Sequence, residues 1–218
     1  MDKYCSSVSD GSMKLGSEQD TVRANRHTFF ARHDIKPSQT SLVNLAYEGD
    51  NYLRFHTIDK SYKGSGITHR SILVSDSLFV MESGHALFLP LADCIGAVLY
   101  DATRNIFGLA HLGRHNLVQE GGMKNIEYMQ QEFGSKPRDI SVFMSAAAGK
   151  NAYPLHAFDG KSLHEVAAEQ FQRAGIAINQ IEIDTRDTTT DSALFSHSNY
   201  LAGRQSSDGR HALVAIMR

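Results

Sequence analysis

Residues 86–101, ALFLPLADCIGAVLYD, and residues 105–116, NIFGLAHLGRHN, decide the fold of this chain. Both stretches contain short apolar runs of the kind found in buried strands. The first predicts two buried segments, kinked at Pro90 and again at the Ala-Asp-Cys step, because proline has no N–H to donate to a central ladder. The second predicts a buried strand that passes through GRHN into a helix over residues 116–133. An apolar stripe indicates this helix, although the Gly121-Gly122 pair lowers helix stability.

Towards the N-terminus, the pattern predicts one helix and three strands. Residues 18–33 carry apolar side chains at near-helical spacing, with acid before base at the start of the helix. Strands are expected at 41–47, 52–58 and 72–80, where β-branched and aromatic residues gather. Residues 1–17 are rich in Ser, Gly, Asp and Lys without a period, which predicts a loop or a frayed arm.

Towards the C-terminus, we expect a strand at 139–144, a Gly/Ala-rich loop at 145–153, a helix at 162–175 and a strand at 211–217. Ser162 and Glu165 have the spacing of a capping box at the start of that helix. Strands and helices alternate only in this half of the chain. The prediction is therefore an α+β fold with a mixed β-sheet flanked by helices, in a single domain over 18–218 after a flexible segment at 1–17.

Composition narrows the classes of function. With 22 Lys and Arg against 24 Asp and Glu, the formal charge of −2 lacks the basic field that nucleic-acid binding needs. Two cysteines make no disulfide framework, and the first residues contain no apolar signal region. The longest apolar stretch is too short to span a membrane. We therefore expect a cytoplasmic protein with neither a nucleic-acid nor a membrane partner.

Three side chains stand out as candidate metal ligands: His56, Cys94 and His111. Each lies in or at the end of an apolar strand, where a polar group needs a partner to offset desolvation. Two imidazoles and a thiolate with one open position are the donor set of a catalytic zinc site. Their spacing matches no short metal motif, so the residues alone also allow a buried core cysteine and hydrogen-bonded histidines.

The chain also resembles a known family. EQDTVRANRHTFF, FHTID, SDSLFV with Asp76, LPLADCIGAVLYD and AHLGRHN occur in the order of the corresponding segments of YfiH/YlmD-type proteins. That family was first described as multicopper polyphenol oxidases, and later as zinc-dependent purine nucleoside phosphorylases with adenosine deaminase activity. The resemblance implies a YfiH-like fold, one zinc held by His56, Cys94 and His111, and a purine nucleoside and phosphate as substrates.

Position in the sequence and the resemblance together suggest further site residues. Asp93, next to Cys94, and His115, four residues after His111, are candidate proton carriers by position. Asp93 is equally well explained as a structural residue at a strand kink, and His115 more simply as a solvated histidine after Gly113. Arg114, Gly149, Tyr153 and Ser196 stand where the family binds substrate. Two family arginines are missing from LFSHSN, and the Trp-Arg-Gly of the family is replaced by Arg-His-Asn. Because arginine binds oxyanions best, these changes predict weak phosphorolysis and a preference for deamination.

Other functions remain open at this point. Two histidines and a cysteine are also the equatorial ligands of a blue-copper site. A multicopper oxidase commonly has His-x-His pairs, however, and none of the eleven histidines lies two residues from another. Cys94 and His111 could instead act as a metal-free thiol dyad. A divergent member that binds a nucleoside or a partner without turnover is the last alternative, and the oligomeric state is not predicted.

Overall fold

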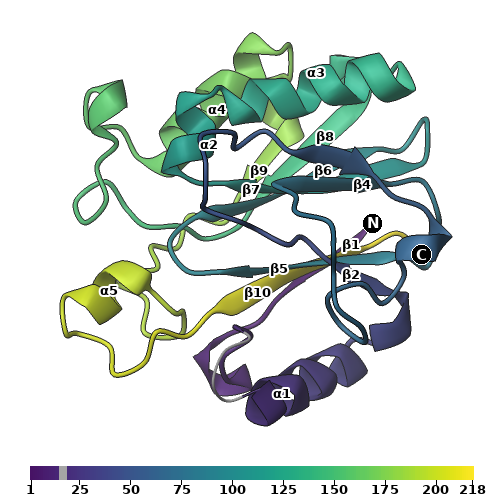
Figure 1. The fold of residues 1–218 in the computed structure, drawn as a ribbon. Helices are drawn as coiled ribbons and strands as arrows, with labels where there is room; N and C mark the ends of the chain where they lie inside the picture. The colour runs from purple at the N-terminus through teal and green to yellow at the C-terminus, as the bar shows by residue number, and fades with distance from the viewer. Residues whose placement is uncertain (15–18) are drawn as a thin grey trace.

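The computed structural model describes residues 1–14 and 19–218, and they form two β-sheets packed face to face between helices (Figure 1). The four-stranded sheet has the order β1-β10-β5-β2 and the six-stranded sheet the order β3-β4-β7-β6-β8-β9. Helix α1 covers the outer face of the first sheet, and α2, α3 and α4 cover the outer face of the second (Figure 1). The layers therefore run helix, sheet, sheet, helix.

The four-stranded sheet joins the two ends of the described chain. Antiparallel pairs link β10 to β1 on one side and to β5 on the other, and β2 lies parallel to β5. Its strands are β1 (Asp2–Cys5), β2 (Thr40–Leu42), β5 (Ala86–Leu91) and β10 (His211–Ile216).

The six-stranded sheet is mixed as well. Its centre is antiparallel, and β3 and β9 are added in parallel at the two edges. Its strands are β3 (Phe55–Thr57), β4 (Ser77–Val80), β6 (Ile95–Asp101), β7 (Ile106–Leu112), β8 (Ile140–Met144) and β9 (Ile181–Ile183).

Apolar side chains fill three interfaces between these layers. Leu87 of β5, Val98 of β6 and Phe107 of β7 belong to the core between the sheets. Phe30 of α1 packs against Phe88 on the outer face of the four-stranded sheet, with ring centroids 5.2 Å apart. The helices that cover the sheets are α1 (Gln19–Arg32), α2 (Arg114–Val118), α3 (Gly121–Phe133) and α4 (Leu163–Arg173), and α5 (His197–Leu201) precedes β10.

Most of the predicted elements are confirmed, with differences in their extent. The α+β class, the helix now seen as α1 and the Ser162–Glu165 capping box are present, with the Ser162 hydroxyl accepting from the Glu165 N–H. The strands expected at 41–47, 52–58 and 72–80 are shorter, and they divide between two sheets. The helix expected over 116–133 is two helices, because Glu120 adopts a left-handed φ of 62° between them.

Two predictions are wrong: a frayed N-terminal arm and an interruption of the strand at Pro90. The N-terminal arm is not frayed where Asp2–Cys5 pair with β10 and where Met13 is fully buried; residues 15–17 of that arm lie outside the described residues. Of the two interruptions predicted within 86–101, the one at the Ala-Asp-Cys step is confirmed, since β5 ends at Leu91 and β6 begins at Ile95. Pro90 does not interrupt β5, because it remains paired with Ala212 of β10. The N–H and the carbonyl of Ala212 both bond to Ser6, on the side of β10 opposite β5, so β10 needs no N–H from Pro90. On the other side of β5, β2 ends at Leu42, opposite Phe88, and does not reach Pro90.

Candidate functional site

A pocket of about 530 Å³ opens at one end of the two sheets. Its wall comes from the extended segment before β3, the turn between β5 and β6, the β7–α2 junction, the loop after β8, and α5 with the start of β10. The lining residues are Leu45, Ala46, Tyr47, Tyr52, Asp76, Pro90, Leu91, Ala92, Asp93, Cys94, His111, Gly113, Arg114, His115, Asn116, Tyr153, His197, Ser198, Leu201 and Arg210.

Cys94 and His111 meet at Gly113 on the wall of this pocket. A Cβ atom added at Gly113 would lie 3.0 Å from both the Cys94 Sγ and the His111 Cε1. The two side chains therefore lie close together around Gly113, where an added Cβ would press on both. Burial, with the neighbouring Asp93 carboxylate, raises the pKa of the Cys94 thiol to about 12, and burial lowers the pKa of His111 to about 4.

His56, the third expected metal ligand, does not join this pair. It lies on the edge strand β3 opposite Leu78 of β4, is half-buried, and is not part of the pocket wall. Across residues 1–14 and 19–218, no three His, Cys, Asp or Glu side chains are grouped so that they could hold a metal ion. The residues do not fit the expected three-ligand zinc site, and the same holds for copper.

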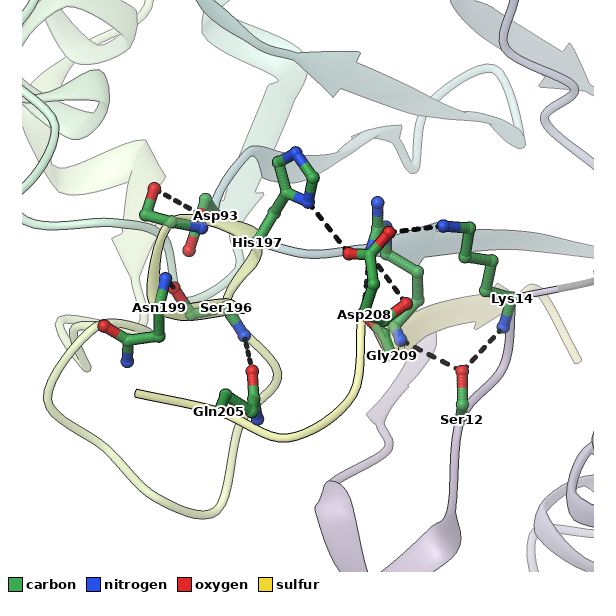
Figure 2. Close-up of polar contacts among 11 residues, drawn as sticks. Ser12, Lys14, Asp93, Ser196, His197, Asn199, Gln205, Asp208 and Gly209 are labelled. Carbon is green, nitrogen blue, oxygen red and sulfur yellow. Dashed lines mark hydrogen bonds and ion pairs between the residues drawn. The ribbon is translucent and has the colours of Figure 1, made fainter. Parts of the chain in front are cut away.

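Asp93 holds α5 against the turn between β5 and β6. Its Oδ1 accepts from the Thr188 hydroxyl at 2.7 Å. Its Oδ2 accepts from both the N–H and the hydroxyl of Ser198 at 2.7 Å, on the side of Asp93 that faces α5 (Figure 2). The residue is 3% exposed and has a left-handed φ of 76°. Protein donors thus occupy both oxygens, which supports the structural alternative over a proton carrier.

Tyr52 and His115 form an aromatic wall of the pocket. Their rings stack at 4.8 Å between centroids with an interplanar angle of 18°. The Asn116 amide donates to the Tyr52 carbonyl at 2.7 Å, and the Tyr52 N–H donates to the Gln119 side chain at 3.0 Å. Helix α2 therefore fixes the position of the segment that carries Tyr52.

Two guanidinium groups, those of Arg114 and Arg210, also line the pocket. Arg210 uses one nitrogen to bond the Asp208 carboxylate at 2.6 Å and the Gly209 carbonyl at 2.7 Å. Arg114, at the start of α2, is exposed and makes no side-chain hydrogen bond within the described part of the chain. The pocket therefore keeps donors that can bind an anion.

A third group of charges lies where α5 meets β10. The Nδ1 of His197 lies 2.8 Å from the Asp208 carboxylate, whose other oxygen accepts from Lys14 at 2.5 Å (Figure 2). Partial burial acts to raise the pKa of Asp208, but hydrogen bonds from Arg210, Lys14 and His197 outweigh it and hold this pKa well below its usual range.

Asp76, which lines the pocket, is held by Arg54, which does not. Its carboxylate, 3% exposed, accepts from the Arg54 Nε at 2.7 Å and from a second guanidinium nitrogen at 2.9 Å. This bidentate pair ties the segment before β3 to the start of β4.

The predicted site residues divide into two groups. Asp93, Cys94, His111, Arg114, His115 and Tyr153 line the pocket, whereas His56, Gly149 and Ser196 do not. The Gly149 N–H instead donates to Asp187, and Ser196 caps α5 by accepting from the Asn199 N–H. The sequence analysis missed Tyr47, Tyr52, His197 and Arg210 as pocket residues. Of these, only His197 stands in a compared segment, LFSHSN, and only the fold brings the four together.

Comparison with known proteins gives one family. The family described as "Multi-copper polyphenol oxidoreductase laccase" matches residues 4–160. A purine nucleoside phosphorylase of Mycobacterium bovis is 25% identical over 93% of this chain and 82% of its own length. Purine nucleoside phosphorylase YlmD of Bacillus subtilis is 29% identical over 49% of this chain, and a Bacteroides thetaiotaomicron purine nucleoside phosphorylase is 22% identical over 79%. These two matches span only 38% and 60% of the relatives' lengths.

Solved structures support the fold. YfiH of Bacillus licheniformis superposes with a TM-score of 0.83 at 22% identity, over 95% of this chain and 85% of the other. YlmD of Geobacillus stearothermophilus gives the same TM-score and coverage at 20% identity. Among the helices in the described residues, none combines the length and apolar character needed to cross a membrane.

Proposed function

Because the chain belongs to the multi-copper polyphenol oxidoreductase laccase family, whose curated relatives above are named purine nucleoside phosphorylases, we propose that its pocket binds a purine nucleoside and phosphate and transfers the ribosyl group between them. The observation that carries this proposal is the combination, in one pocket, of stacked aromatic rings with two guanidinium groups. A pocket of about 530 Å³ has the size of ordinary small-molecule sites.

The base would lie against the aromatic wall. Tyr52 is held at both its N–H and its carbonyl by α2, so its ring is already in place before a ligand arrives. Stacking a base on a fixed aromatic ring gives affinity without ordering a flexible side chain. Tyr47, whose ring meets that of His111 edge-on at 6.5 Å, offers a second apolar surface.

The phosphate would lie between Arg114 and Arg210. The sequence predicted weak phosphorolysis because family arginines are absent from LFSHSN. That prediction did not include Arg210, which lines the pocket, or Arg114, whose guanidinium forms no hydrogen bond within the described residues. Guanidinium groups are the side chains best suited to oxyanion binding. We therefore place phosphorolysis ahead of deamination, reversing the order that the sequence suggested.

The donor set lends less support to copper oxidation, which relies on a metal held by His56, Cys94 and His111. The resemblance ties phosphorolysis and deamination to the same three ligands, so the donor set does not separate those two reactions; the two guanidinium groups favour phosphorolysis. A metal-free thiol dyad is also disfavoured, because the raised pKa of Cys94 keeps its sulfur protonated near neutral pH. The remaining competitor is a protein that binds nucleosides without turnover.

Product analysis tests the proposal. We expect inosine and adenosine to yield free base and ribose 1-phosphate only when phosphate is added. Arg210→Gln should raise the KM for phosphate about tenfold or more, since a charge-assisted contact is worth roughly 1.5–3 kcal/mol. Arg138→Gln, at a side chain that is 76% exposed, is the control. Conversion of adenosine to inosine would favour deamination, and nucleoside binding without any product would favour the non-catalytic alternative.

A further inference from the structure

An imidazole–carboxylate pair, His197 with Asp208, lies on the wall of the pocket apart from the Cys94–His111 pair. His197 is the first residue of α5, lines the pocket and has a side chain that is 44% exposed. Its Nδ1 faces the Asp208 Oδ1 at 2.8 Å, and the other ring nitrogen lies on the opposite side of the ring from Asp208 (Figure 2). No hydrogen bond to that second nitrogen, Nε2, is formed within the part of the chain that the structure describes.

The surroundings of the pair keep Asp208 ionised. Lys14 from the N-terminal segment and Arg210 from the start of β10 both bond its carboxylate. Tyr200 stacks on His197 at 6.4 Å from within α5, and Asp93 bonds the next residue, Ser198. An ionised carboxylate at Nδ1 fixes the tautomer in which Nδ1 carries hydrogen, and it orients the ring so that Nε2 points away from Asp208.

We propose that His197 is a catalytic acid of this pocket, donating a proton from Nε2 to the purine base as it leaves, and that Asp208 is its positioning residue. The inference rests on the function proposed above and adds the group that completes it. A purine anion is a poor leaving group, so a donor aimed at the base lowers the barrier to its departure.

The step balances in atoms and electrons. A phosphate oxygen forms a bond to C1′ of the ribose while the C1′–N9 bond breaks and its electron pair goes to the purine. The Nε2 proton of the His197 imidazolium passes to the purine nitrogen, giving the neutral base. The proton that hydrogen phosphate loses on becoming a ribose 1-phosphate dianion returns through solvent to His197. No oxidant or reductant takes part.

The geometry also distinguishes this role from a structural tether. α5 is already fixed by other contacts: Ser196 caps it, and Asp93 bonds the N–H and hydroxyl of Ser198. Arg210 and Lys14 hold Asp208 without His197. Replacing the imidazole should therefore leave the fold and the ligand contacts in place.

A substrate whose base leaves without protonation tests the inference directly. In 7-methylguanosine the base already carries a positive charge, so its departure needs no acid. We expect His197→Gln to lower kcat for inosine by about 10²–10³-fold, with KM values for inosine and phosphate within about threefold of the original. The same variant should keep its rate on 7-methylguanosine within about threefold. The falling alkaline limb of the kcat profile for inosine should disappear in the variant.

Two further variants complete the design. Asp208→Asn should lower kcat for inosine by about tenfold and spare 7-methylguanosine, and His27→Gln, at an exposed position on α1, should change neither rate. Equal losses on both nucleosides, or unchanged kcat for inosine in His197→Gln, would overturn the role of His197. Unmodified protein that cleaves neither nucleoside would instead overturn the proposed function, and the inference with it.

Discussion

Tyr52 and His115 stack 4.8 Å apart and so join the extended segment before β3 to the first turn of α2. The contact makes one wall of the pocket out of two segments that are distant in sequence. Since α2 also bonds the Tyr52 backbone, the ring is held in place without a ligand.

The first prediction concerns this wall. Replacing Tyr52 by Leu should raise the nucleoside Kd about tenfold or more, because base–aromatic stacking is worth roughly 1–3 kcal/mol. Tyr52→Phe keeps the ring and should change the Kd less than threefold. Isothermal titration with inosine measures both. Equal weakening in the two variants would show that the hydroxyl rather than the ring binds the ligand.

The second prediction concerns metal. Because no third His, Cys, Asp or Glu among residues 1–14 and 19–218 joins Cys94 and His111 in a metal-binding group, we expect purified protein to hold well below one zinc per chain after dialysis. Tyr47→His places an imidazole beside His111 and should raise the zinc content towards one per chain. Adding Cys94→Ala to that variant should remove the gain. Elemental analysis that finds one tightly held zinc in the unmodified chain would contradict the donor set described here.

The third prediction separates the structural role of Asp93 from catalysis. Asp93→Asn keeps the left-handed backbone, which asparagine tolerates, but removes the charge that three donors share. We expect the free energy of unfolding to fall by about 2–3 kcal/mol. Asp20→Asn, at a fully exposed side chain, should leave it nearly unchanged. Urea denaturation followed by circular dichroism gives both values, and an unaffected Asp93→Asn would remove the anchoring role.

The fourth prediction is a loss of stability in mild acid. Burial lowers the pKa of His85 and of His211 to about 4 in the folded chain, against about 6.5 when unfolded. Between these values the unfolded state binds more protons, so stability is fully present above pH ~6.5 and falls as the pH drops towards ~4. Each histidine accounts for up to about 3 kcal/mol. His85→Gln should reduce the slope of unfolding free energy against pH by about one proton.

Long apolar runs were the elements most open to prediction. β5, β6 and β7 have nearly continuous buried side chains, and α4 starts at a capping box. The short strands could not be predicted from sequence. β1 and β9 contain four and three residues, and it is the pairing with neighbouring strands that defines them. Local sequence also could not show that β2 and β3 belong to different sheets.

The site was predictable only in part, for a related reason. Cys94 comes directly before β6 and His111 lies near the end of β7, and these two strands pair with Gly96 opposite His111, so their meeting follows from the strand order. His56 also lies on a strand, but the three-residue edge strand β3 leaves it outside the pocket wall. Tyr52 and His197 reach the pocket from an extended segment and a five-residue helix, positions set by hydrogen bonds to distant residues.

The pairing of β1 with β10 has a consequence for synthesis of the chain. β10 lies between β1 and β5, yet among the described strands it is the last to be synthesised. Until residues 211–216 leave the ribosome, β1 has no partner and one edge of β5 stays open, so the four-stranded sheet cannot close before then. Such late, long-range pairing slows folding and leaves strand edges free to join other chains. Nascent chains stalled before residue 211 should therefore be the form that chaperones bind and that aggregates most readily.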